Sequence, residues 1–109
     1  MNVMLFRIID DKGLKDSECY KKANIDRKLF SKLRNNEYRP SKSTVILLAL
    51  ALELPLRETK SLLKKAGFAL SDSNMSDMIV KYYISKKNYN ISLIDETLLQ
   101  YDQKTLVNY

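Results

Sequence analysis

The 109-residue sequence contains no histidine and a single cysteine, Cys19. Histidine is the commonest general base near neutral pH, and with cysteine it supplies the ligands of familiar zinc sites. Gly13 and Gly67 are the only glycines, too few for a Gly-rich loop that binds phosphate. We therefore expect no enzyme activity, no cofactor and no metal site.

Long apolar runs are also missing. The longest, 45–52, has eight residues, whereas a membrane span needs about 20. The N-terminal stretch "MNVMLFRIIDDKG" lacks a basic n-region and is interrupted by Arg7, Asp10 and Asp11, which argues against a secretory signal. A single cysteine allows no intrachain disulfide and suits a reducing compartment. We expect a cytoplasmic protein that does not contact a membrane.

Positive charge is unevenly distributed along the chain. The sequence carries 19 Lys and Arg against 13 Asp and Glu, a net charge of +6. Up to Gly67 the count is 15 against 8, or +7, whereas from Phe68 onward it is 4 against 5, or −1. The excess favours an anionic partner, but charge alone does not separate DNA, RNA, an acidic protein surface and a membrane.

Apolar residues recur at helical spacing, and no segment shows a convincing period of two, so the sequence predicts an all-α fold. Five helices are expected before Gly67: one with Met4, Leu5, Ile8 and Ile9 inward, then 17–23, 26–35, 42–54 and 56–66. Asp16 or Ser17, Asp26 and Ser41 are the expected N-caps, and Asn24 suits a turn with positive φ. The fourth helix is apolar nearly all round, which predicts a buried centre.

The segment 68–109 is expected to form a helical hairpin. Its sixth helix, capped by Asn74 or Ser76, carries Met75, Met78, Ile79 and Tyr82 on one stripe that we expect to belong to the core. The seventh helix carries Ile91, Ile94, Leu98 and Tyr101. Because this segment is too short to fold alone, we expect it to pack on the 1–67 domain or on a second subunit.

The second and third helices are joined by about three residues, which is the geometry of a helix-turn-helix. The stretch from "GLKDSECYKKANIDRKLFSKLRNN" to "ETKSLL" resembles the Cro/C1 (XRE) family of helix-turn-helix domains. Gly13 and Leu14 start the family pattern, and Cys19 takes its small-residue position. Ile25 and Asp26 match the turn of the family pattern, and Phe30 and Leu33 match the core positions of its recognition helix. Pro40 and Ser41 match the Pro-Ser loop, and Ala49 and Leu52 match the packing helix.

This resemblance, over residues 2–66, implies a five-helix lambda-repressor-like domain that reads DNA with the helix 26–35. Three residues depart from the family pattern: Asn24 replaces the turn glycine, and Arg34 and Asn36 replace a glutamate and a glycine. A longer stretch, 18–71, is also similar to an uncharacterised bacterial group that occurs alone or as a C-terminal module of larger proteins. That second similarity implies no activity.

The candidate DNA contacts lie in and around the third helix. Once Phe30 and Leu33 turn inward, Arg27, Lys28, Ser31 and Lys32 fall on the outer face, where they can reach base edges. Arg34, Arg39 and Lys42 are expected to meet phosphate, and Lys15 to hold the neighbouring backbone. The alternative for these cations is a solvated surface, and Ser31 can equally be exposed without a role.

The C-terminal segment has more tyrosines than so small a segment needs for its own core: Tyr82, Tyr83, Tyr89 and Tyr101. Tyrosine is favoured at interfaces because it joins an apolar body to a polar tip. One interpretation is a homodimer that places two recognition helices one DNA turn, about 34 Å, apart. Docking onto another protein and ordinary intramolecular packing are the alternatives.

The sequence thus favours a sequence-specific double-stranded DNA-binding protein, a small transcriptional regulator of a bacterium or phage. The main alternative is a protein-interaction module on a helix-turn-helix scaffold, such as an antitoxin, an adaptor or a phage counter-defence inhibitor, that binds an acidic protein surface. RNA binding is a weaker third choice, because exposed aromatic residues are not concentrated on the basic helix.

Overall fold

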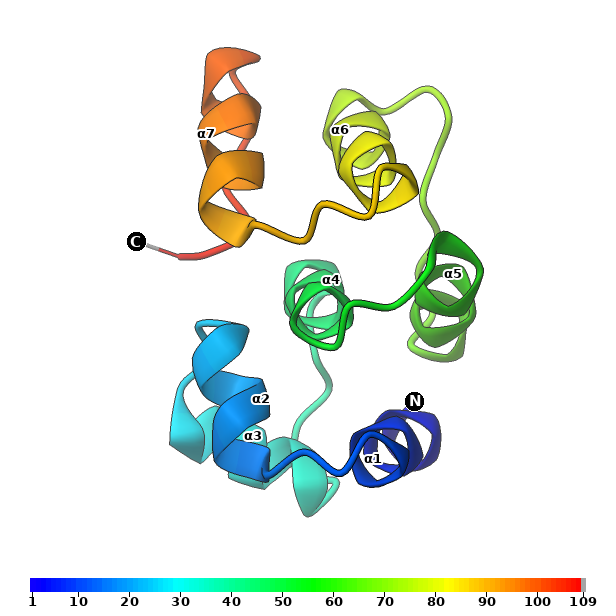
Figure 1. Cartoon of the computed structure of the whole chain (residues 1–109), viewed down its shortest axis with the longest axis vertical. Coiled ribbons are helices and arrows are strands. Elements are labelled where there is room, and N and C mark those ends of the chain that lie inside the picture. Colours follow the sequence, from blue (N-terminus) through cyan, green and yellow to red (C-terminus); the bar gives the residue numbers. More distant parts are fainter. Residues whose placement is uncertain (109) are drawn as a thin grey trace.

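A computed structural model describes residues 1–108, which form seven helices and no strand, as the all-α prediction requires. The helices are α1 (Asn2–Asp11), α2 (Asp16–Lys22), α3 (Arg27–Arg34), α4 (Lys42–Ala51), α5 (Leu56–Lys65), α6 (Met75–Ser85) and α7 (Ile91–Gln100). Figure 1 shows α4 in the middle, with α1, α2 and α3 below it and α6 and α7 above it. The first three helices and the last two therefore form opposite ends of the molecule.

Helix α4 is the centre of the core, as its uniformly apolar sequence predicts. Every residue from Thr44 to Ala51 is buried. The expected cap is present, because the Ser41 hydroxyl accepts a hydrogen bond from the Thr44 backbone N–H at 3.2 Å. Both ends of the molecule pack on this helix, so its burial holds them together.

Two other caps differ from the sequence predictions. Asp26 occupies the N-cap position of α3, but its carboxylate makes no capping hydrogen bond. Helix α2 already includes Asp16 and Ser17, and its N-cap is Lys15, whose backbone N–H donates to Glu18 Oε1 at 3.1 Å. The Asp16 carboxylate is instead held by the Arg34 guanidinium, a tertiary contact that local sequence does not reveal.

The tight turns fall where the sequence places residues that tolerate a positive φ. Asn24, between α2 and α3, has a φ of 57°, and Asn36, after α3, has a φ of 60°. The Ile25 N–H donates to the Tyr20 carbonyl at 2.9 Å and closes the first of these turns. Ile25 is buried beneath that turn, which sets the direction in which α3 leaves it.

Segment 68–108 shares the core of segment 1–67. Ile79, Val80 and Ile84 of α6 and Ile94 and Leu98 of α7 belong to the same buried cluster as α4. Asn74 and Asn90 cap the two helices. No helix in the described part of the chain is long and apolar enough to cross a membrane.

The predicted inner stripe of α6 is wrong for three of its four residues. Met75, Met78 and Tyr82 are 43%, 46% and 58% exposed, and only Ile79 of that stripe is buried. Helix α6 is apolar on two sides, and the side that packs on the core is the one with Val80 and Ile84. Periodicity alone did not identify which apolar side faces inward.

Candidate nucleic-acid interface

The α2–turn–α3 unit is held rigidly by aromatic packing. The buried Phe30 ring of α3 meets Phe6 of α1 edge to face, with centroids 5.7 Å apart, and lies 5.6 Å from the Tyr20 ring of α2. Leu33, one turn further along α3, is also buried. These contacts orient one side of α3 toward the core, so the opposite side must face solvent.

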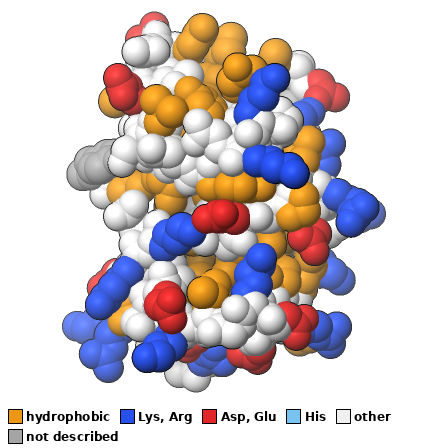
Figure 2. Space-filling model, in the orientation of Figure 1, with side chains coloured by type: hydrophobic (Ala, Val, Ile, Leu, Met, Phe, Trp, Pro, Cys, Tyr) orange, Lys and Arg blue, Asp and Glu red, His pale blue; other side chains and the backbone are white. Residues whose placement is uncertain are grey.

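That solvent side carries the four residues expected to reach bases: Arg27, Lys28, Ser31 and Lys32. All four side chains are exposed, and within residues 1–108 none of them makes a hydrogen bond or an ion pair. We call these four residues the α3 face. Figure 2 shows Lys and Arg side chains gathered at the lower left of the molecule, over α2 and α3.

Arg34, which was predicted to meet phosphate, makes contacts inside the protein. Its Nε and Nη2 donate to the two carboxylate oxygens of Asp16 at 2.8 and 2.7 Å. Its Cζ also lies 4.1 Å from the centre of the Phe6 ring. One guanidinium therefore joins α1, α2 and α3, and the sequence interpretation of Arg34 as a free basic residue did not include this contact.

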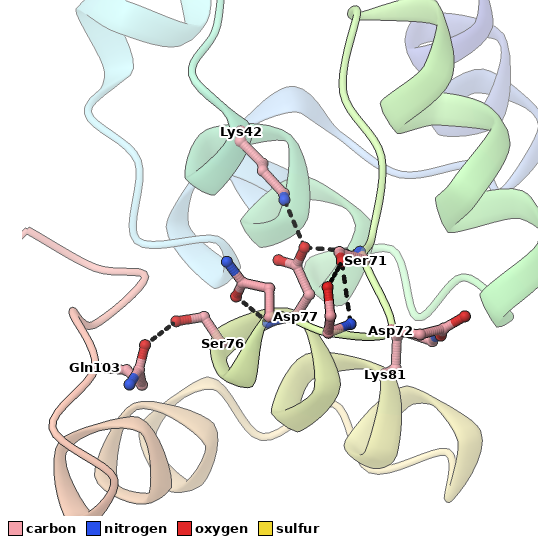
Figure 3. A network of polar contacts seen from close by, with 9 residues as sticks. Lys42, Ser71, Asp72, Ser76, Asp77, Lys81 and Gln103 are labelled. Carbon is pink, nitrogen blue, oxygen red and sulfur yellow. Dashed lines mark hydrogen bonds and ion pairs between the residues drawn. The ribbon is translucent and has the colours of Figure 1, made fainter.

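Lys42 is likewise engaged inside the protein. Its Nζ lies 2.8 Å from Asp77 Oδ2, and the Asp77 side chain is only 6% exposed. The same oxygen accepts the Ser71 backbone N–H at 2.8 Å, and Figure 3 shows both donors converging on it. Lys42 thus joins the start of α4 to α6 and is not a free cation at the loop.

Lys15 and Arg39 remain exposed, as their predicted contacts with the DNA backbone require. Arg39 lines an open groove of about 760 Å³ together with Arg34, Lys65 and the N-terminal residue Met1. Asn2 stabilises one wall by donating from Nδ2 to the Leu33 carbonyl at 2.7 Å. Sequence analysis missed Lys65, because only tertiary folding brings the end of α5 beside the loop after α3.

The four tyrosines do not form one surface. Tyr82 and Tyr101 are exposed, whereas Tyr83 and Tyr89 are half-buried. The Tyr83 hydroxyl lies 2.6 Å from the Thr97 hydroxyl and so joins α6 to α7 within the chain. Burial, and secondarily the Glu53 carboxylate, raises the pKa of Tyr89. Intramolecular packing accounts for this second pair.

Cys19 lies in the core between α2 and its neighbours. Burial, reinforced by the negative charge of Asp16, raises the pKa of the thiol to about 11. The nearby Lys22 lowers it, but not enough to offset burial. The thiol is therefore protonated near neutral pH, as expected for a small core residue.

Comparison with protein families, with curated proteins and with solved structures finds no match to this chain.

Proposed function

We propose that the chain is a five-helix, lambda-repressor-like helix-turn-helix protein with a C-terminal helical hairpin, and that it binds double-stranded DNA through α3 without catalysis. The α3 face carries this proposal, because its three cations and one hydroxyl are exposed and have no partner within residues 1–108. Arg34, by contrast, is already paired. A set of free cations on one face of a rigidly held helix suits an anionic ligand.

The residue chemistry suits the DNA major groove. Residues near the N-terminus of a recognition helix contact base edges, and Arg27 and Lys28 lie in the first turn of α3. Arginine and lysine donate to O6 and N7 of guanine, and a serine such as Ser31 serves either base pair. Lys15, Arg39 and the added Lys65 are placed to hold phosphate.

Internal ion pairs lower the number of cations that we expect to meet phosphate, and the expected salt dependence follows. From Lys15 to Lys42 there are nine basic residues and four acids, a balance of +5. Lys22, Arg34 and Lys42 are paired internally, which leaves six. Of these six, the exposed Lys15, Arg27, Lys28, Lys32 and Arg39 are the ones that we propose meet DNA. Neutralising about five phosphates gives a slope of log affinity against log salt near −4.5.

The decisive experiment measures binding to duplex DNA by fluorescence anisotropy across a salt series. Random-sequence duplex and DNA from around the protein's own gene are compared for the wild type and an Arg27→Ala/Lys28→Ala/Lys32→Ala variant. We expect the triple variant to bind at least tenfold more weakly, with the slope reduced to about −2. Preference for the native DNA would identify a sequence-specific regulator.

The matched control removes three exposed cations from another helix: Arg57→Ala/Lys60→Ala/Lys64→Ala on α5. Both variants lose the same net charge, so a loss confined to the α3 variant assigns binding to that helix. Equal losses in both would mean that only net charge matters. Unchanged affinity in a folded α3 variant would refute the site, and a wild type that binds no duplex would refute DNA binding.

A protein-interaction module is the second candidate. The exposed Met75, Met78 and Tyr82 on α6 favour it, because Met and Tyr are enriched where proteins meet. If this is the function, duplex DNA should give no salt-dependent binding signal. Binding of an acidic protein would then depend on the α3 face or on α6.

A further inference from the structure

A small pocket of about 210 Å³ lies between α4, α6 and the segment of chain that follows α7. Its polar lining includes Lys42 and Ser43 at the start of α4, Asn74 and Asp77 at the start of α6, and Lys104 after α7. Pockets that hold drug-sized molecules usually exceed about 300 Å³, so this one suits a smaller ligand.

The segment after α7 is fixed against the start of α6, so the three walls of the pocket are held together. Figure 3 shows the contact, in which the Ser76 hydroxyl donates to Gln103 Oε1 at 2.8 Å. Gln103 directly precedes Lys104, which places that lysine beside the first turn of α6.

The Asp77 carboxylate has one oxygen in use and one oxygen left over. Oδ2 accepts hydrogen bonds from Lys42 Nζ and from the Ser71 N–H, both at 2.8 Å, whereas Oδ1 makes no hydrogen bond within residues 1–108 (Figure 3). The side chain is only 6% exposed, yet no fully buried polar side-chain atom in the described part of the chain lacks a partner. Oδ1 therefore reaches open space, which the pocket supplies. A carboxylate oxygen in so buried a position requires a donor, and a ligand in the pocket can provide one.

The other free side chains that line the pocket are donors or carry positive charge. Lys42 is already paired with Asp77, but Lys104 makes no ion pair among the described residues. Asn74 uses its carbonyl oxygen to accept the Asp77 N–H at 3.1 Å, which leaves its amino group to donate. The Ser43 hydroxyl is a further donor.

The starts of α4 and α6 add backbone donors. One amide of each first turn is already capped, because Ser41 accepts the Thr44 N–H and Asn74 accepts the Asp77 N–H. The two amides before each of these, at residues 42–43 and 75–76, have no acceptor within their own helices. The positive ends of two helices therefore border the same pocket.

These groups together select a ligand that is an anion and also a hydrogen-bond donor. The Lys42–Asp77 pair has no net charge, so Lys104 and the two helix starts leave the pocket positive. Hydrogen phosphate meets both requirements, because it carries negative charge and keeps one proton near neutral pH. Sulfate and the phosphodiesters of DNA have no such proton, and a phosphate monoester loses its last one at about pH 6. Donors on three walls also suit a tetrahedral anion better than a planar carboxylate.

We propose that this pocket binds inorganic phosphate in the hydrogen phosphate form. The phosphate O–H donates to Asp77 Oδ1, and the other oxygens accept from Lys104, Asn74, Ser43 and the amides of the two helix starts. Because the ligand contacts α4, α6 and the segment after α7, it stabilises the junction between segments 1–67 and 68–108. The site is separate from the α3 face, and it does not depend on the proposed function.

The test is isothermal titration calorimetry of the whole chain with sodium phosphate and, separately, with sodium sulfate at neutral pH and equal ionic strength. We expect phosphate to saturate a single site and sulfate to bind at least tenfold more weakly, because Asp77 Oδ1 repels an anion that has no proton to donate. Phosphate should also raise the midpoint of thermal unfolding more than sulfate does. Equal binding of the two anions would overturn the proposal, as would a chain that binds no phosphate.

Lys104→Ala and Lys86→Ala form a matched pair, since both substitutions remove one exposed lysine. Lys104 lines the pocket, whereas Lys86 follows the far end of α6. We expect Lys104→Ala to weaken phosphate binding at least tenfold and Lys86→Ala to change it less than twofold. Equal losses in the two variants would mean that net charge alone attracts the anion, and the pocket would be refuted.

Asp77→Asn tests the role of the phosphate proton. In a variant whose circular dichroism matches the wild type, the preference for phosphate over sulfate should fall to less than threefold. A tenfold preference that persists in that variant would refute the assignment of the proton to Asp77. If the substitution unfolds the chain, the comparison of the two anions and the Lys104→Ala variant still decide between binding and its absence.

Discussion

At the scale of single residues, two arginines of one helix differ in whether an acidic side chain of the protein already pairs with them. Arg27 and Arg34 are on the same helix, yet Arg27 has no partner among residues 1–108, whereas Arg34 is paired with Asp16 and stacked on Phe6. A cation that already has an internal partner offers little to phosphate. The count of basic residues therefore overstates the charge that is available for binding.

Substitutions of Asn24 test whether the turn between α2 and α3 requires a residue that tolerates a positive φ. Because its φ is 57°, a side chain there bears a steric cost that glycine avoids and asparagine partly offsets. Asn24→Ala should lower the free energy of unfolding by about 1 kcal/mol, whereas Asn24→Gly should leave it equal or slightly higher. Urea unfolding of the two variants measures both, and equal losses would contradict this account of the turn.

The pKa and the reactivity of the Cys19 thiol test whether this side chain is buried. Its folded-state pKa of about 11 exceeds the usual 9.0, so the folded chain keeps the proton that an unfolded chain releases. Stability should fall as pH rises from about 9 to 11. In the native protein near pH 8, thiol labelling should be many times slower than in urea. Equally rapid labelling in the native state would refute the buried position.

At the scale of an element, α3 combines a structural side and a solvent side within eight residues. Phe30 and Leu33 position the helix, and Arg34 ties its last turn to α1 and α2. The α3 face has no ion-pair or hydrogen-bond partner in the described part of the chain. Under the proposed function, stability and DNA binding therefore depend on different residues of one helix. Substitutions on the two sides should separate the two properties.

Arg34→Ala and Lys32→Ala make that comparison. Loss of the two Arg34–Asp16 hydrogen bonds and of the Phe6 contact should lower the free energy of unfolding by about 1–2 kcal/mol, since the pair is partly exposed. Lys32→Ala should change stability by less than about 0.5 kcal/mol but weaken DNA binding. Thermal unfolding and anisotropy measure the two effects, and the reverse pattern would contradict the assignment.

At the scale of the whole molecule, the segments 1–67 and 68–108 are joined by one core and by a partly buried ion pair. Lys42 at the start of α4 meets Asp77 in α6, and Ile84 and Leu98 extend the cluster around α4. Removing the second segment would expose apolar surface on α4. We expect a chain that ends at Gly67 to lose much of its stability.

Asp77→Ala tests the link between the segments. It removes the acceptor of both Lys42 Nζ and the Ser71 N–H, and it leaves a lysine that is only 34% exposed without its partner. Breaking a buried pair costs about 3–5 kcal/mol, and the exposure of Lys42 favours the lower value. In urea unfolding, a Lys42→Met/Asp77→Leu double variant should lose less than the sum of its single variants. Exact additivity would show that the two groups do not interact.

Several features followed from local sequence because their causes are local. Helical periodicity predicted the all-α class, and the apolar run predicted that α4 is buried. Asn24, Ser41 and Asn74 marked a turn and two caps that the structure contains. A backbone that needs a positive φ or a capping oxygen selects residue types at one position. Such requirements are legible without knowledge of distant contacts.

Other features depended on residues far apart in the chain, so only the tertiary structure decided them. Asp16 holds Arg34 and Asp77 holds Lys42, which are two cations of the predicted binding set, and folding placed Lys65 beside Arg39. For α6, two apolar sides competed for one core, and packing left Met75, Met78 and Tyr82 outside. The sequence by itself determined the helices and the basic character of α3; long-range pairing and burial determined which side chains are free to bind.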